Sequence, residues 1–224
     1  MLDRIASGRT DLVIEWIDQG GDEAAVEQGT SLIGWCAYYG DVSAMRHLQR
    51  RGASVASLGS DLGLNGAAFH GHWRLCEYLI EQGADPRRAL PETGETPLHA
   101  ALCKVASLPH ERVVEVLLAA GADPNATTKA GAPTDAFMRD VRTRGETPLH
   151  RAAAYGTAHA IAMLIAAGAT IEARDFNGDT PLGWASWALR DAEVLHLLCY
   201  GRHAVNPGRR TMTENLLGDP RREK

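Results

Sequence analysis

The sequence lacks the features that mark several large protein classes. Only 6% of its 224 residues are aromatic, and its four cysteines lie far apart with no C-x-x-C pair. Neither a disulfide framework nor a cysteine-rich zinc site is therefore indicated. No run approaches the roughly 18 consecutive apolar residues of a membrane span, and the first residues lack the basic and apolar segments of a signal peptide. We expect a soluble protein of the reducing cytoplasm.

Positive charge is also scarce. The formal net charge is −5, which argues against the broad basic surface that nucleic-acid binding requires. The charge is uneven, because residues 1–30 hold seven acids and two bases whereas residues 202–224 hold six bases and three acids. We expect a protein partner rather than nucleic acid or a membrane, and a monomer by default.

Catalytic signatures are missing as well. The sequence has no G-x-x-x-x-G-K-[ST] phosphate loop, no G-x-S-x-G nucleophile elbow and no H-E-x-x-H zinc motif. The best metal-like cluster, His99, Cys103 and His110, lacks the fourth ligand of a structural zinc site. We therefore expect no enzymatic activity, no cofactor and no metal.

What the sequence does contain is a repeat marked by glycines. Each marker glycine follows two apolar doublets spaced at i, i+1, i+4 and i+5, such as Leu75-Cys76 and Leu79-Ile80 before Gly83. This spacing forms one stripe of an α-helix, and a glycine directly after it is a common helix stop. The pattern predicts six short amphipathic helices, which end at Gly20, Gly52, Gly83, Gly121, Gly168 and Gly201.

A second helix is predicted upstream in each unit. It begins with a threonine at the cap and a proline in the first turn, where the missing amide is no loss. These residues are Thr96, Pro97 and His99, then Thr147, Pro148 and His150, and finally Thr180 and Pro181. The earlier units keep the spacing but have other residues at these positions.

The T-P-L-H segments and the period of about 33 residues resemble the ankyrin-repeat family. The resemblance implies an all-α solenoid of stacked helix pairs joined by β-hairpin-like loops. We expect one array over residues 1–203, with repeats at 1–22, 23–55, 56–86, 87–126, 140–173 and 174–203. Residues 204–224 form a tail, and whether it packs on the last repeat is left open.

Two insertions depart from the period. Four extra residues around Ala106 to Pro109 lengthen an inter-helix loop, and about fourteen extra residues form a finger over 127–144. The stretch from Pro133 to Val141 has cap-like residues and Phe137 four positions before Val141, which suggests a short projecting helix. We expect the finger either to contact a partner through Phe137 or to be a tolerated insertion.

Histidines and cysteines have mainly structural interpretations. The resemblance implies that His99 and His150 hydrogen-bond neighbouring loops. Cys36 and Cys76 occupy apolar helix positions and should be core thiols. Cys103 falls at an outward-facing position of its helix and is the best candidate for a modifiable thiol.

The remaining signal is a row of aromatic residues. By the resemblance, the seventh and eighth positions from the signature threonine face a concave groove, and four of the five pairs there contain a ring. Such rings are favoured at binding hot spots, although they could also pack between adjacent helices. Trp35, Trp73 and Trp184 are assigned to packing. The hairpin tips add a mixed polar rim, which comprises Glu92, Glu95, Arg144, Glu146, Phe176, Asn177 and Asp179.

These observations favour a non-catalytic module that binds a partner protein through the groove and the hairpin loops. The alternatives are a small-molecule or enzymatic groove using His70 and hairpin carboxylates, a nucleic-acid role through the basic tail at Arg209-Arg210 and Arg221-Arg222, and self-association. The predicted partner-binding residues are Tyr38, Tyr39, Phe69, His70, Lys104, Phe137, Arg144, Glu146, Tyr155, Phe176 and Trp187.

Overall fold

The computed structural model describes residues 1–103, 107–134 and 141–200. Within these ranges the chain forms twelve α-helices, one 3-10 helix and one two-stranded ladder. The first helices of successive pairs are α1 (Leu2–Ala6), α3 (Leu32–Tyr39), α5 (Leu64–His70), α7 (Pro97–Ala101), α9 (Pro148–Tyr155) and α11 (Pro181–Trp187). The second helices are α2 (Leu12–Asp18), α4 (Val42–Arg50), α6 (Trp73–Glu81), α8 (Leu108–Ala119), α10 (Ala158–Ala166) and α12 (Ala192–Tyr200).

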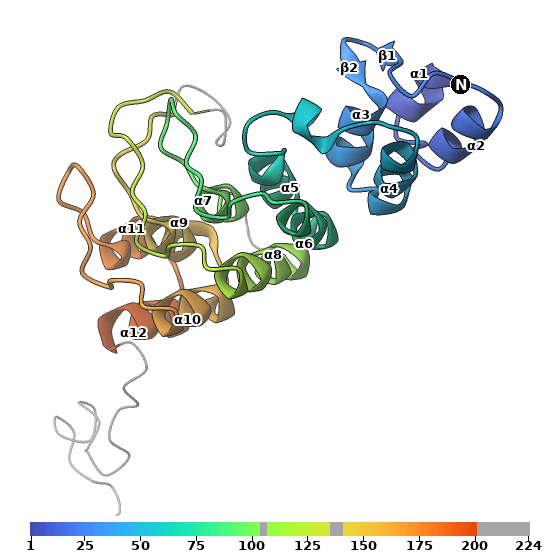
Figure 1. The fold of residues 1–224 in the computed structure, drawn as a ribbon. Coiled ribbons are helices and arrows are strands. Elements are labelled where there is room, and N and C mark those ends of the chain that lie inside the picture. The colour runs from blue at the N-terminus through green and yellow to red at the C-terminus, as the bar shows by residue number, and fades with distance from the viewer. Residues whose placement is uncertain (104–106, 135–140, 201–224) are drawn as a thin grey trace, which may run out of the picture.

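The helix pairs stack side by side into a solenoid, as the sequence predicts. First helices contact the first helices of adjacent pairs, and second helices likewise contact second helices. Figure 1 shows the pairs in chain order, with the long loops projecting on the side of the first helices. Each pair therefore buries its apolar stripe against its neighbours, and the core extends along the array instead of surrounding one centre. No helix in the described ranges is long and apolar enough to cross a membrane.

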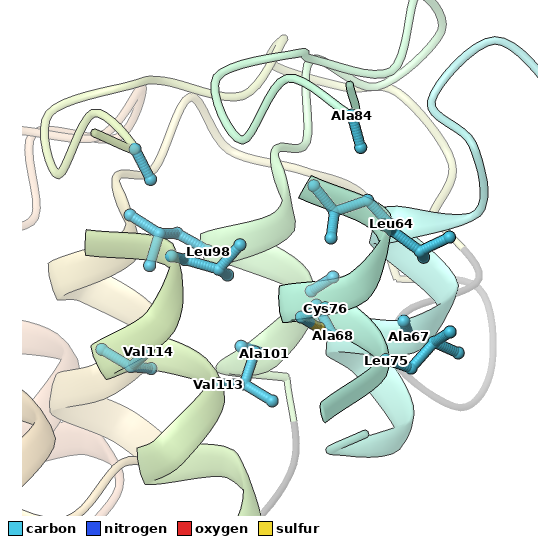
Figure 2. Close-up of a cluster of buried hydrophobic side chains, with 14 of the residues drawn as sticks. Leu64, Ala67, Ala68, Leu75, Cys76, Ala84, Leu98, Ala101, Val113 and Val114 are labelled. Carbon is cyan, nitrogen blue, oxygen red and sulfur yellow. The ribbon is translucent and has the colours of Figure 1, made fainter. Parts of the chain in front are cut away.

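The apolar doublets form this core. Leu75 and Cys76 from α6 belong to one buried cluster with Leu64 and Ala68 of α5 and Val113 of α8 (Figure 2). All of these side chains are buried. The spacing i, i+1, i+4 that predicted the helices thus also determines which helical face packs inward.

The marker glycines end the second helices as expected. The described members of the set, Gly20, Gly52, Gly83, Gly121 and Gly168, all have positive φ. At Gly83, for example, φ is +97° and the amides of Gly83 and Ala84 bond to Ile80 and Leu79 carbonyls. This closure satisfies carbonyls that the helix itself leaves without a donor.

The T-P-L-H segments form capping boxes that also bond to the next unit. In α7, the Thr96 amide donates to His99 Nδ1 at 3.2 Å, and His99 Nε2 donates to the Glu146 carbonyl at 3.1 Å. His150 makes the same two bonds, to Thr147 and to the Asp179 carbonyl. Burial lowers the pKa of His99 to about 3, and the nearby Arg151 charge acts in the same direction. His99 is therefore neutral, with its proton on Nε2.

The loops between pairs are hairpin-like. β1 (Val26–Glu27) and β2 (Thr30–Ser31) pair in antiparallel register, with Val26 opposite Ser31. In the finger, Pro133 and Arg142 form an isolated antiparallel bridge.

The expectation of a helix that begins at Pro133 is wrong for the described ends of the finger. Pro133 and Arg142 are extended, and the Thr134 amide donates to the Val141 carbonyl at 3.1 Å. Cross-strand pairing is favoured over a helix at these ends, because the buried Thr143 also bonds the Ala132 carbonyl on the opposite strand. Residues 135–140, with Phe137, lie outside the described residues, as do 104–106 with Lys104, and the tail from 201 onward. Helix α8 begins at Leu108 with Pro109 in its first turn.

Candidate functional site

The ends of the first helices present several rings to solvent. Tyr38 is 51% exposed and Trp187 is 84% exposed, and Tyr39 and Tyr155 are each 37% exposed. Phe69 is only partly exposed and packs against the core. The predicted row therefore contains both open and packed rings.

At the N-terminal end of the row, the rings contact one another. Tyr38 and Tyr39 meet edge to face at 5.0 Å between centroids, and Tyr39 stacks on Trp35 at 6.1 Å. His70 lies 4.9 Å from the Tyr38 ring. The Tyr39 hydroxyl donates to the Ala6 carbonyl at 2.9 Å. Part of this cluster thus stabilises the stack, which is the packing alternative for these rings.

At the C-terminal end, the first-helix ends and the hairpins line an open hollow of about 680 Å³. Trp187 and Tyr155 lie on its helical side. Arg144 lies on its hairpin side, with the guanidinium 5.8 Å from the centroid of the Trp184 ring. The other lining residues are Val141, Arg142, Glu146, Ala154, Asp179, Trp184 and Ala188.

The sequence placed Glu95 and Glu146 on an exposed rim, and this is wrong. Glu95 is 5% exposed and Glu146 is 1% exposed. Both bond Arg151, which is fully buried, with its Nη2 2.6 Å from an oxygen of each carboxylate. Glu146 also accepts from the Thr128 hydroxyl and from the Arg144 amide. Burial acts to raise the pKa of Glu146, but the Arg151 charge and these hydrogen bonds outweigh it and hold the pKa well below its usual range.

The local reason for this arrangement is the turn before each first helix. Glu95 and Glu146 each precede the capping threonine, at a point where the hairpin folds over the helix end. Arg151, one turn into α9, reaches both carboxylates. The signal that could have revealed the cluster is the repeated Gly-Glu-Thr-Pro-Leu-His segment followed by Ala100 in one unit and by Arg151 in the next.

The assignment of Cys103 as a modifiable thiol is also wrong. Cys103 is 6% exposed, its thiol donates to the His99 carbonyl at 3.0 Å, and Arg151 Nη1 lies 3.1 Å from its sulfur. Burial raises the pKa of Cys103 to about 11, so the thiol is protonated at neutral pH. Helix α7 ends at Ala101, so the outward-facing helical position expected for Cys103 does not exist.

Four of the seven predicted rim residues are exposed. Arg144 and Phe176 are exposed, and Phe176 reaches 80%. Glu92 and Asn177 are also exposed, whereas Asp179 is partly buried. Arg142, which the sequence reasoning missed, is exposed beside Arg144.

The structure removes two hairpin carboxylates from the alternative of an enzymatic groove. Glu95 and Glu146 are held by Arg151, so neither carboxylate is free to exchange protons with a ligand. His70 contacts the rings of Tyr38, Phe69 and His72. Across the described ranges, no group of three or more His, Cys, Asp or Glu residues is arranged to hold a metal ion.

Comparison with known proteins identifies the repeat. The family model described as "Ankyrin repeats (3 copies)" matches residues 33–128 and 131–210. The chain is 30% identical over 151 residues to the target of rapamycin complex 2 subunit AVO2 of Saccharomyces cerevisiae, which covers 64% of this chain and 31% of that protein. It is 30% identical over 175 residues to ankyrin repeat and SOCS box protein 3 of Bos taurus, which covers 68% of this chain and 33% of that protein.

A shorter relative is matched over most of its length. Cyclin-dependent kinase 4 inhibitor B of Bos taurus is 33% identical over 127 residues, which is 57% of this chain and 82% of the inhibitor. The chain spans about a third of the length of the yeast subunit and of the SOCS box protein. The family match covers more than half of the chain, and it agrees with the stacked helix pairs and the capping boxes. The chain therefore belongs to the ankyrin-repeat family.

Proposed function

We propose that this chain is a non-catalytic module that binds a partner protein through its concave face. That face comprises the ends of the first helices and the adjoining hairpins. Ankyrin repeats are protein-interaction modules, and the family is generally non-enzymatic. One relative is named as a subunit of a complex and another as an inhibitor of a kinase, so both names describe an association with another protein.

The observation that carries the proposal is the exposure of large rings on one face. Aromatic residues are only 6% of the chain, yet Tyr38, Tyr155 and Trp187 are all exposed to solvent at the ends of first helices. Burying apolar surface is favourable by about 25 cal/mol per Å², and tyrosine and tryptophan bury much area with few rotatable bonds. A partner that covers these rings would gain this energy.

Hydrogen bonds tie the first-helix ends to the neighbouring helix pairs. His72 Nε2 donates to the Tyr38 carbonyl at 2.9 Å, and Arg190 donates to the Ala153 carbonyl at 3.0 Å. Each bond ties the end of one first helix to the next pair along the array. A surface held in this way loses little freedom when a partner binds, which favours affinity.

We place this binding in the reducing cytoplasm. The four cysteines are all free thiols, and Cys36, Cys76 and Cys103 are buried. Free buried thiols are typical of proteins from a reducing compartment.

The test is a comparison of captured partners. The native cell extract is passed over the wild-type chain, over a Tyr155→Ala/Trp187→Ala variant, and over a Tyr200→Ala control. Tyr200 is 57% exposed but lies on a second helix, so the control removes a comparable ring from outside the concave face. Circular dichroism first verifies that all three chains fold.

We expect partners that the wild-type chain and the Tyr200→Ala control both capture and the double variant does not. The same set of proteins on all three chains would show that the concave face is not the binding site. Loss on Tyr200→Ala alone would place the site on the second helices and would equally refute the proposal.

A further inference from the structure

The hairpin strand that borders the C-terminal hollow has two faces of different character. Thr143 is buried, and its hydroxyl donates to the carbonyls of Lys129 and Ala132. Since successive side chains of an extended segment point to opposite sides, Arg142 and Arg144 share the outward side. Both are exposed and both line the hollow.

These two arginines give the hollow a local positive charge. Arg142 donates to the Gly131 carbonyl at 2.7 Å, and Arg144 lies over the Trp184 ring. In the part of the chain that the structure describes, neither forms an ion pair with a carboxylate. Of the acids that line the hollow, Glu146 is buried against Arg151, which it shares with Glu95, and Asp179 is partly buried. The exposed charges of the hollow are therefore the two arginines, and their sign is opposite to the net −5 of the chain.

The two arginines line a second hollow as well. The hollow of about 680 Å³ also includes Trp187 and Tyr155. The second hollow, of about 540 Å³, includes Phe176. Arg142 and Arg144 therefore form a cationic strip that is shared by two hollows, each of which carries an exposed ring.

We propose that this strip binds an extended acidic segment of the partner protein, in which carboxylates alternate with bulky apolar side chains. The proposal rests on the proposed function and names the chemistry of its partner. The carboxylates contact Arg142 and Arg144, and the apolar side chains enter the two flanking hollows. Arginine suits this role because its planar guanidinium binds a carboxylate through two parallel hydrogen bonds.

Charge also indicates which segments of this chain itself could occupy the strip. The tail, residues 202–224, holds six bases and three acids, so the arginine strip repels it. Residues 1–30 hold seven acids and two bases, so a second copy of the chain is the main competitor. However, Arg9 already pairs with Asp11 and Arg51 with Asp18, which reduces the acidic charge that this end offers.

The experiment selects binders from a random peptide display library on the full chain. The same selection is made on an Arg142→Gln/Arg144→Gln variant and on an Arg87→Gln/Arg112→Gln control. The control removes the same charge from exposed arginines that lie away from the hollow. The strongest peptide is then synthesised with a dye, together with a version in which every acid is replaced by its amide, and affinities are measured by fluorescence anisotropy.

We expect acidic and aromatic or leucine residues to be enriched on the wild-type chain and on the control. The Arg142→Gln/Arg144→Gln variant and the amide peptide should each weaken binding about tenfold or more, and added salt should weaken the wild-type complex. Enrichment of neutral or basic peptides, or equal affinity for the variant and the wild-type chain, would overturn the proposal. Light scattering that shows self-association dependent on Arg142 and Arg144, without peptide binding, would assign the strip to a second copy and also overturn it.

Failure of this proposal can be told apart from failure of the proposed function. If Tyr155→Ala/Trp187→Ala loses its captured partners but selected peptides are not acidic, the concave face binds proteins and only the charge assignment is wrong. If the capture pattern is also unchanged, the concave face is not a binding site at all.

Discussion

The two ends of the row of first helices carry aromatic rings at equivalent positions, but the rings have different surroundings. At the N-terminal end, Tyr38 and Tyr39 contact each other and Trp35, and the Tyr39 hydroxyl bonds α1. At the C-terminal end, Trp187 is 84% exposed beside an arginine-lined hollow. Tyr38 and Trp187 occupy the same helical position, which therefore carries a ring packed on neighbouring rings at one end and a ring that is almost fully exposed at the other.

A second position shows the difference in how hairpins are attached. The fourth residue after the signature threonine, or after Ser31 in its place, is Trp35, Arg151 or Trp184 in three of the units. Trp35 donates to the Glu27 carbonyl and Trp184 to the Asp175 carboxylate, each at 3.1 Å and each within its own unit. Arg151 instead reaches the carboxylates of two units. At this position, each of the three side chains bonds the hairpin of its own unit to the first helix. Only arginine also bonds the hairpin of the neighbouring unit.

The largest effect is expected from removing Arg151. Arg151→Leu leaves the Glu95 and Glu146 carboxylates buried without their cation, and breaking a buried pair in this way costs about 3–5 kcal/mol. Urea unfolding followed by circular dichroism measures the loss. The contrast is with Arg112→Leu, which breaks an exposed pair with Glu115 and should leave the unfolding curve unchanged.

Adding Glu146→Gln to Arg151→Leu tests the cause. If the unpaired carboxylate is responsible, the double variant regains part of the lost stability. Equal stability of Arg151→Leu and wild type would show that the cluster contributes nothing to the C-terminal half.

Acid should weaken the C-terminal half in two steps. Burial lowers the pKa values of His99 and His150, so the unfolded chain binds protons that the folded chain does not. Their contribution is fully present above the ordinary histidine pKa of about 6.5 and is lost as the pH falls below it. The depressed pKa of Glu146 adds a further loss below about pH 4.5, where its unfolded form becomes protonated.

Thermal melts between pH 7.5 and pH 3 measure both steps. The third unit supplies the control, since it carries Asn65 where the fourth and fifth units have His99 and His150. His99→Asn removes the group whose pKa burial lowers most, and should flatten the fall of the melting temperature between pH 6.5 and pH 5. A wild-type melting temperature that is constant over this interval would contradict the assignment.

Most of the fold could be predicted from the sequence because its signals are local. The apolar doublets, the capping threonines and the closing glycines each act within a few residues, and they mark the helices that the structure contains. The errors arose where contacts are distant in sequence. Glu95 is separated from Arg151 by 56 residues, and nothing next to Glu95 indicates that it is buried.

The candidate site was predictable only in part for the same reason. The exposure of Trp187 follows from its position at a first-helix end, but the position of Arg142 depends on a finger with no counterpart in the other units. Cys103 was misassigned because the helix ends two residues before it, at Ala101, which the apolar pattern did not reveal.

The smallest effects are expected where the two ends of the array differ in the residue that closes a first helix. Gly40 closes α3 with φ +76°, and the Cβ of any other residue there would come within 2.6 Å of the His72 ring. Leu189 stands at the same register after α11 with φ +53°, and it is 90% exposed. A left-handed conformation costs a residue with a Cβ about 1–2 kcal/mol.

Gly40→Ala should therefore destabilise the chain by about 1–2 kcal/mol, because it adds this strain and displaces His72 from the Tyr38 carbonyl. Leu189→Gly should act in the opposite direction, since it relieves the strain and loses little burial. Its gain is about 0.5 kcal/mol or less, because glycine gives the unfolded chain more freedom. Urea unfolding of both variants checks the signs. Destabilisation by Leu189→Gly would mean that the exposed leucine is held by contacts, and that the C-terminal end is as closely packed as the N-terminal end.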